Sequence, residues 1–261
     1  MWQGFNILFD KKLTVKKMPK TRILVSSAHK RFGGIRALDG VSLEINEGDI
    51  YGLIGPNGSG KTTLINVISG VYQPDSGEVQ VNGKKITGQS PYADCFHCLT
   101  RSFQIPKLWS KLSVLSNLMI AAMGKNATLN LSEAREKALQ MLDRLHLGRL
   151  MNEPANTLSG GQLKLLEFGR ALVHNSKVIL LDEPFAGVFP NMQPMLIEII
   201  QGRARTGTSF LIVSHVISRI AEVSDRLGVL NRGRLIAEGT PAEVFRDKSV
   251  IEAYLGGKGV A

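Results

Sequence analysis

A glycine-rich stretch of the sequence, GLIGPNGSGKTT, fits the spacing G-x-x-x-x-G-K-[ST] from Gly55 to Thr62. It follows an apolar segment and precedes the helical segment LINVISG. In this strand–loop–helix context, backbone N–H groups surround phosphate oxygens at the positive end of the helix. Lys61 is expected to reach the β- and γ-phosphates of a nucleotide, and Thr62 to bind Mg²⁺. The predicted nucleotide-binding residues are Gly55, Pro56, Asn57, Gly58, Ser59, Gly60, Lys61, Thr62 and Thr63. The alternative is a glycine-rich turn with a surface lysine.

Two adjacent acids end the apolar segment VILLDE. Asp182 can supply a second Mg²⁺ ligand from a strand beside the phosphate-binding loop. Glu183 lies just past the strand end, where a carboxylate can orient and polarise an attacking water. The alternative for the pair is the N-terminal cap of the next helix. Together with the loop, the pair predicts ATP hydrolysis with ATP and Mg²⁺ as cofactors.

The segment NTLSGGQLKLLEFGRAL places Ser159 and two glycines ahead of a helix with an apolar stripe, which alone is only a good helix start. Between a phosphate-binding loop and LLDEP, however, LSGGQ resembles the ATP-binding subunits of ABC transporters. The resemblance runs from about residue 23 to residue 255. It implies that two such subunits close head to tail. One subunit's Ser159, Gly160, Gly161 and Gln162 would then contact the γ-phosphate that the other subunit holds.

The resemblance assigns three further residues. Gln104, in SFQIP, matches a glutamine that touches Mg²⁺ or water and responds to the membrane subunit; a surface glutamine is the alternative. His215, after FLIVS, matches a histidine at the γ-phosphate, and its place at the carboxyl end of a buried strand independently favours a ligand-binding role. Phe32, in KRFGG, is a candidate for stacking on adenine, with core packing as the alternative. The predicted catalytic residues are Glu183, His215 and Gln104, and the predicted metal ligands are Thr62, Gln104 and Asp182.

Three segments indicate the subfamily. FQIPKLWSKLSVLSNLMIAA, DEPFAGV and the end IAEGTPAEVFRDKSVIEAYLG are similar to ATP-binding subunits of branched-chain amino-acid importers, whose relatives move urea or short amides. DEPFAGV also resembles the lipopolysaccharide-export ATPase, which is the alternative. The resemblance implies several partners: transmembrane permease subunits, a second ATP-binding subunit, identical or paralogous, and a separate solute-binding protein. It places the chain peripherally at the cytoplasmic face of the inner membrane, without nucleic acid.

Phe189 departs from the family pattern. The loop after DEP usually carries an Asp, or in this branch an Asn, that hydrogen-bonds across the dimer. A phenyl ring cannot make that bond, so it either packs across the interface or marks altered hydrolysis. Because the other predicted catalytic residues are retained, we expect an active ATPase; a hydrolysis-impaired regulatory subunit is the alternative.

The elements that position these residues follow from hydrophobic periodicity. Strands are expected in ILVSSAHKRF, VSLEI, GDIYGLIG and GEVQVNGKKI, and buried parallel strands in VILLDE, SFLIVSH and RLGVLN. LSVLSNLMIAAM and SEAREKALQMLDRLHL are expected to be helical. The fold class is α/β, a P-loop NTPase core of ABC type with an antiparallel β subdomain and an inserted helical subdomain. The expected divisions are a basic extension at 1–22, an ATP-binding domain at 23–257 with its helical part at about 94–157, and a tail at 258–261.

The charge distribution argues against nucleic acid as a binding partner. Most of the formal net charge of +10 comes from residues 1–31, where Lys and Arg outnumber the single acid Asp10, so the remaining body is only mildly basic. The sequence holds one cassette, unlike the ABC ATPases of translation, and no long coiled coil between Lys61 and Ser159, unlike those of DNA repair. No apolar run reaches the roughly 18 to 20 residues of a membrane span, and the start lacks the features of a secretory signal. We therefore expect a cytosolic chain.

Overall fold

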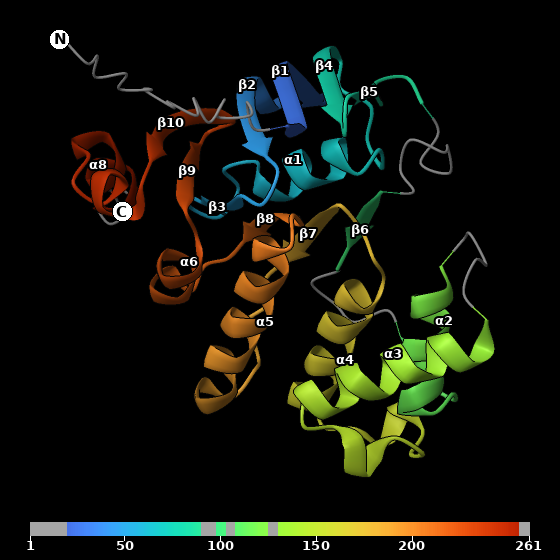
Figure 1. Cartoon of the computed structure of the whole chain (residues 1–261). Helices are drawn as coiled ribbons and strands as arrows, with labels where there is room; N and C mark the ends of the chain where they lie inside the picture. The colour runs from blue at the N-terminus through green and yellow to red at the C-terminus, as the bar shows by residue number, and fades with distance from the viewer. Residues whose placement is uncertain (1–19, 90–97, 103–107, 125–129, 256–261) are drawn as a thin grey trace, which may run out of the picture.

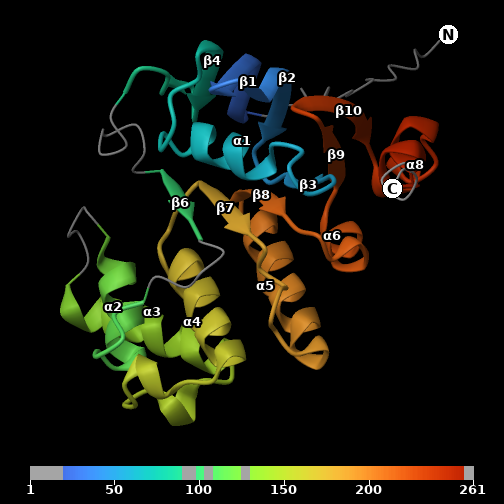
Figure 2. The same cartoon turned by 180° about the vertical axis from the view of Figure 1, so that it is seen from behind.

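The structure is a computed structural model that describes residues 20–89, 98–102, 108–124 and 130–255 (Figure 1). Two β-sheets pack with helix α1 (Lys61–Ile68) between them, and helices α2 to α6 lie on the other side of the larger sheet (Figures 1 and 2). The expected fold class, an α/β core with an antiparallel β subdomain and an inserted helical subdomain, is confirmed.

The smaller sheet is antiparallel and has the strand order β2-β1-β4-β5. In β2, Val41, Leu43 and Ile45 are buried and the residues between them are exposed, as expected for a sheet with one covered face. The strands are β1 (Thr21–Phe32), β2 (Ile35–Asn46), β4 (Ser76–Val81) and β5 (Lys84–Lys85).

The first strand begins earlier than the sequence suggested. We expected an extension up to residue 22, but β1 starts at Thr21. Arg22 is only 3% exposed, and its guanidinium lies 2.7 Å from Glu47 and also donates to Asn82. These partners lie far along the chain, so a charged residue in a basic run gave no local sign of burial. The remaining part of the expected extension, residues 1–19, and the expected tail lie outside the described residues.

The larger sheet has the strand order β10-β9-β3-β8-β7-β6, parallel except for β10. β7 and β8 are buried along their whole length and β9 is buried except at its two ends, which confirms the strands expected in VILLDE, SFLIVSH and RLGVLN. Since the parallel strands end at one edge, the loops after β3, β7 and β8 gather there. The strands are β3 (Ile50–Ile54), β6 (Leu99–Arg101), β7 (Val178–Asp182), β8 (Ser209–Val213), β9 (Arg226–Asn231) and β10 (Arg234–Gly239).

Strand β6 corrects the expected helical limits. We expected a helical subdomain over about 94–157, yet residues 99–101 pair in parallel with β7 through Thr100 and Ile179. Three residues are too few for a period-2 pattern, and pairing with β7 is a tertiary effect. The helical layer also extends past 157, because Gly169 of α4 packs closely against Leu118 and Leu145. The layer comprises α2 (Val114–Met123), α3 (Leu131–Arg144), η2 (Gly148–Leu150), η3 (Ala155–Thr157) and α4 (Gly160–Val173).

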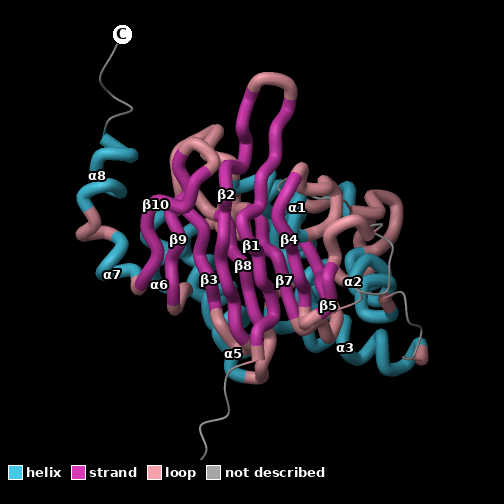
Figure 3. Tube along the Cα trace, turned by 90° about the horizontal axis from the view of Figure 1, so that it is seen from above, coloured by secondary structure: helices cyan, strands magenta, loops and turns pink. Residues whose placement is uncertain are grey.

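Strand β7 divides the core into two parts. Ile179 and Leu181 pack with the helical side, whereas Val178 and Leu180 pack with α1 and the smaller sheet. Short helices near the end of the chain, α7 and α8, flank β10 (Figure 3). The remaining helices are η4 (Pro190–Met192), α5 (Gln193–Arg205), α6 (Ile217–Val223), α7 (Pro241–Val244) and α8 (Lys248–Leu255). Among the described residues, no helix combines the length and apolarity that crossing a membrane requires.

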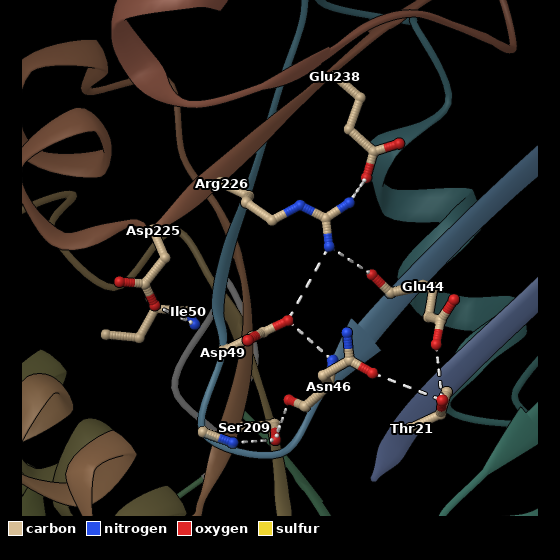
Figure 4. A network of polar contacts seen from close by, with 10 residues as sticks. Thr21, Glu44, Asn46, Asp49, Ile50, Ser209, Asp225, Arg226 and Glu238 are labelled. Atoms are coloured by element: carbon tan, nitrogen blue, oxygen red, sulfur yellow. Dashed lines mark hydrogen bonds and ion pairs between the residues drawn. The ribbon is translucent and has the colours of Figure 1, made fainter. Parts of the chain in front are cut away.

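A polar network centred on Arg226 joins the two sheets at the edge where β3, β8 and β9 begin (Figure 4). The Arg226 guanidinium pairs with Glu238, lies 3.9 Å from Asp49 and donates to the Glu44 carbonyl of β2 at 3.2 Å. The Ser209 hydroxyl donates to the carbonyl of Asn46 at 2.7 Å. The sheets are thus tied together at the edge opposite to the loops that carry the predicted site residues.

Candidate active site

The phosphate-binding loop, residues 55–63, comprises the connection between β3 and α1 and the first residues of α1, and its backbone angles depend on its glycines. Gly55 and Gly60 have φ angles of +151° and +109°. A Cβ atom at these positions would lie 2.0 Å from the Leu230 carbonyl oxygen and 2.3 Å from that of Ala37. Neither position accepts a side chain. Gly60 is also the N-cap of α1, so no side chain caps the first turn, whose N–H groups are the donors that bind anions at helix starts.

Lys61 lies inside this loop. Its ammonium donates to the carbonyl oxygens of Gly55 at 2.7 Å and Pro56 at 2.9 Å. Burial lowers the pKa of Lys61, and the negative charges of Glu183 and Asp182 oppose that change. The tertiary structure therefore brings the lysine of β3–α1 close to the two acids at the end of β7.

Asp182 ends β7 and is almost fully buried, at 5% exposure. Its carboxylate oxygen Oδ2 lies 3.6 Å from the Arg101 guanidinium, and its backbone N–H donates to the Ser102 hydroxyl at 3.1 Å. Burial raises the pKa of Asp182, and the charge of Arg101 opposes that rise. Sequence reasoning missed Arg101, and its only sequence signal is a basic residue three positions before Gln104.

The donor set fits Mg²⁺. Within the described residues, no group of three or more His, Cys, Asp and Glu side chains is placed to hold a metal ion alone. Mg²⁺ in nucleotide sites takes one or two carboxylates and completes its shell with phosphate oxygens and waters. A buried carboxylate at the strand end and the hydroxyl of Thr62 on the first turn of α1 are ligands of that kind.

Glu183 is held in a strained conformation beside His215. Its φ of +55° is uncommon for a residue with a side chain and costs about 1 to 3 kcal/mol, as is typical of functional sites. The His215 Nδ1 atom lies 2.8 Å from Glu183 Oε2, and the His215 backbone N–H donates to the same oxygen at 3.1 Å. The imidazole is 66% exposed, whereas the Glu183 side chain is 10% exposed. Within the pair, the Glu183 carboxylate is therefore buried and the His215 imidazole lies at the surface.

The LSGGQ residues lie on the other side of the larger sheet from α1. Ser159 caps α4: its hydroxyl accepts from the Gln162 N–H at 3.4 Å, and the Gln162 side chain accepts from the Ser159 N–H at 2.9 Å. Helix α4 packs with the helical core and α1 with the other core, so β7 and β8 separate the two helix starts (Figures 1 and 2). The fold brings Lys61, Asp182, Glu183 and His215 together but keeps residues 159–162 apart from the phosphate-binding loop.

A groove of about 290 Å³ lies beside the LSGGQ residues, between the α3–α4 connection and the loop after β7. Phe189 lines it and is 67% exposed. A Cβ atom at Gly161 would lie 3.5 Å from the Phe189 ring, so the ring lies against the LSGGQ backbone of its own chain. The groove lining includes Leu147, Ser159, Gln162, Val188, Phe189 and Met192.

Phe32 and Tyr72 form an exposed aromatic pair. Their ring centroids are 5.3 Å apart in an edge-to-face arrangement, and Lys30 Nζ lies 5.7 Å from the Phe32 ring centroid. Phe32 is 43% exposed, which argues against the core-packing alternative. Tyr72, just after α1, was not expected from the sequence. Gln104 lies outside the described residues.

A residue of the C-terminal helix also reaches the loop. Burial raises the pKa of the Tyr254 hydroxyl, and a hydrogen bond from the backbone of Gly55 opposes that rise. Helix α8 lies beside the phosphate-binding loop, because Glu252 and Ala253 line one cavity together with Pro56 and Gly58. Nothing in the local sequence pattern pointed to this proximity, because the two segments are neighbours only in the folded chain.

Family models match two parts of the chain. Residues 38–186 match the ABC transporter family, and residues 234–260 match the branched-chain amino acid ATP-binding cassette transporter family. The first match contains the phosphate-binding loop, LSGGQ and both acids. The second contains α8 with Tyr254.

Individual relatives agree with these matches. The chain is 40% identical over 237 residues to "Probable branched-chain amino acid transport ATP-binding protein LivG" of Archaeoglobus fulgidus, covering 87% of this chain and 92% of that protein. It is 34% identical over 227 residues to the lipopolysaccharide export system ATP-binding protein LptB of Escherichia coli, covering 87% and 94%. Among solved structures, the ADP conformation of an ATP-binding cassette of an ABC transporter has a TM-score of 0.78 and 38% identity, covering 90% of this chain and 99% of that chain.

Proposed function

Because this chain belongs to the ABC transporter family of ATP-binding cassettes, we propose that it powers an importer of branched-chain amino acids or of related small solutes such as urea or amides. Two comparisons support this choice of cargo: the match of residues 234–260 to the branched-chain amino acid model, and the 40% identity to LivG of Archaeoglobus fulgidus, which exceeds the 34% identity to LptB of Escherichia coli. The observation that carries the ATPase role is the register of the larger sheet: Leu53 near the end of β3 and Asp182 at the end of β7 both pair with Val213 of β8, so the phosphate-binding loop and the two acids leave the sheet at the same level.

The proposed roles follow from this geometry. Lys61 and the first-turn N–H groups of α1 bind the β- and γ-phosphates. Thr62 and Asp182 would hold Mg²⁺, together with Gln104, which only the family resemblance assigns to the metal; the ion would offset the negative charge that builds up on the phosphate oxygens. Glu183 orients the attacking water and accepts its proton, and His215 fixes the Glu183 carboxylate.

The adenine base stacks on Phe32, for which the exposed edge-to-face pair with Tyr72 provides a ready surface.

Residues 159–162 serve a second cassette. Their separation from the phosphate-binding loop of the same chain supports action in trans, across a dimer in which each LSGGQ contacts the nucleotide of the other subunit. ATP-binding cassettes of this family act as dimers and associate with transmembrane permease subunits. The partner cassette is identical or paralogous, and a separate solute-binding protein delivers the cargo. The assembly places this chain at the cytoplasmic face of the inner membrane.

The test is transport. The chain is purified with its native membrane subunits, reconstituted in vesicles with ATP on its side, and assayed for uptake of labelled leucine, isoleucine, valine and urea with the solute-binding protein present. ATP-dependent uptake that is lost in Glu183→Gln supports the proposal. ATP hydrolysis without uptake of any of these solutes, stimulated instead by lipopolysaccharide, would favour the exporter alternative that the similarity to LptB raises.

A further inference from the structure

Arg101 contacts two different elements of the site at once. It ends β6, and its side chain is only 9% exposed. One guanidinium nitrogen, Nη2, lies 3.6 Å from Oδ2 of Asp182. The other, Nη1, donates to the Asn66 side chain at 2.6 Å and to the Ser69 hydroxyl at 3.0 Å. Asn66 lies on α1 and Ser69 is its C-cap, so Arg101 joins the helix that begins with Lys61 to the acid that ends β7.

The residue after Arg101 fixes the backbone of the same acid. The Ser102 N–H donates to the Leu180 carbonyl at 2.9 Å, and the Ser102 hydroxyl accepts from the Asp182 N–H at 3.1 Å. Ser102 thus positions the Asp182 main chain while Arg101 approaches its carboxylate. Asp182 is thus contacted by the last residue of β6 and by the residue that follows it.

The forked guanidinium explains why an arginine occupies this position. Its two terminal nitrogens reach Asp182 and the α1 side chains simultaneously, with a fixed angle between them, which a single lysine ammonium cannot do. If Arg101 served only to attach β6 to α1, its hydrogen bonds to Asn66 and Ser69 would be sufficient for that role. The contact with Asp182 favours one orientation of the carboxylate, because its Oδ2 atom lies 3.6 Å from the guanidinium.

We propose that Arg101 is a positioning residue that orients Asp182 for Mg²⁺ and couples the metal-binding acid to helix α1. The proposal rests on the proposed role of Asp182 as a Mg²⁺ ligand. Arg101 acts through Asp182 and does not touch the nucleotide. Replacing a group that orients a metal ligand typically lowers the metal affinity by about 10- to 100-fold.

The test measures binding of a fluorescent ATP analogue by the full chain as a function of free Mg²⁺, and separately in EDTA. Arg101→Met removes the charge and the fork, and Arg101→Lys keeps the charge and removes the fork. Both variants are expected to need about tenfold more Mg²⁺ for half-maximal binding, with unchanged binding in EDTA. If Arg101→Lys needed no more Mg²⁺ than the wild type, the proposal would be overturned, because the positive charge without the fork would then be sufficient. A lower Mg²⁺ requirement in Arg101→Met would also overturn it, because Arg101 would then compete with the metal.

Arg22→Met is the matched control. Arg22 is also a buried arginine with an acid and an asparagine as partners, Glu47 and Asn82, but it lies in β1 of the smaller sheet. The Arg22→Met variant is expected to have a lower melting temperature and an unchanged Mg²⁺ requirement. If Arg101→Met does only the same, Arg101 is structural and the proposal fails.

Asp182→Asn separates this inference from the proposed function. It is expected to abolish the Mg²⁺ dependence of binding. If it leaves that dependence intact, the assignment of Asp182 itself fails, and Arg101 has no metal ligand to orient. If it abolishes the dependence while both Arg101 variants behave as wild type, only the inference about Arg101 fails.

Discussion

The Nδ1 atom of His215 lies 2.8 Å from Oε2 of Glu183, and the His215 backbone N–H donates to the same oxygen. One carboxylate oxygen is thus held twice by a residue of the loop after β8, and the backbone of Glu183 itself is left-handed, with a φ of +55°. Neither feature is visible in the sequence. Together they fix the orientation of the predicted general base.

Glu183→Gln is expected to lower ATP turnover by about 100- to 10,000-fold, because the amide keeps the shape but cannot accept the proton of the attacking water. Binding of MgATP is expected to remain, so the variant should accumulate as a dimer. Steady-state hydrolysis and size-exclusion chromatography with ATP measure both effects. Hydrolysis at the wild-type rate would move the catalytic role away from Glu183.

His215→Ala is expected to reduce turnover while changing the free energy of unfolding by at most about 1 kcal/mol, because the imidazole is mostly exposed and the backbone N–H still holds the carboxylate. Turnover and chemical denaturation are measured on the same preparation. A large loss of stability with proportional loss of activity would indicate a structural role instead.

Lys61→Ala is expected to abolish ATP binding, because Lys61 supplies the main positive charge to the β- and γ-phosphates. Folding should be retained, since burial disfavours the charged form of this lysine. Isothermal titration with ATP measures the loss of binding, and a thermal melt measures whether folding is retained. Lys85→Ala, at an exposed ion pair of β5, is the control and should bind as wild type. Equal affinity in both variants would contradict the assignment.

Phe189→Asn is expected to weaken the ATP-dependent dimer and lower turnover, with little change in the stability of the isolated chain. The ring is 67% exposed and covers Gly161, so its apolar surface is available to a partner, where full burial is worth about 1.5 to 3 kcal/mol. Phe189→Leu should keep most of the dimer. Dimerisation and turnover are measured with the native partner subunit. Tighter dimerisation and faster turnover in Phe189→Asn would show that the asparagine restores a polar cross-dimer contact.

Tyr254→Phe is expected to weaken ATP binding modestly, because the buried hydroxyl lies near the backbone of Gly55 in the phosphate-binding loop. The ring stays, so α8 should remain in place. Denaturation and nucleotide titration are compared with Tyr254→Leu, which also removes the aromatic packing. Weaker binding in Tyr254→Leu alone would mean that packing, and not the hydroxyl, supports the loop.

The sequence alone determined the features that depend on local pattern. The glycine and lysine spacing at residues 55–62 predicted the phosphate-binding loop because only glycine accepts its backbone angles. Continuous apolar runs predicted β7 and β8, since strands covered on both faces leave no polar side. The residue order of LSGGQ and LLDEP was enough to identify the family.

Tertiary structure decided what depends on residues far apart in the chain. Strand β6 forms because β7 offers it a partner, and Arg22 is buried because Glu47 and Asn82 meet it. Arg101 reaches Asp182, and α8 lies beside the phosphate-binding loop, only after the sheets and helices have packed. Such contacts follow from the geometry of the folded chain and leave no periodic signal in the sequence, so the residue types were readable in advance but their partners were not.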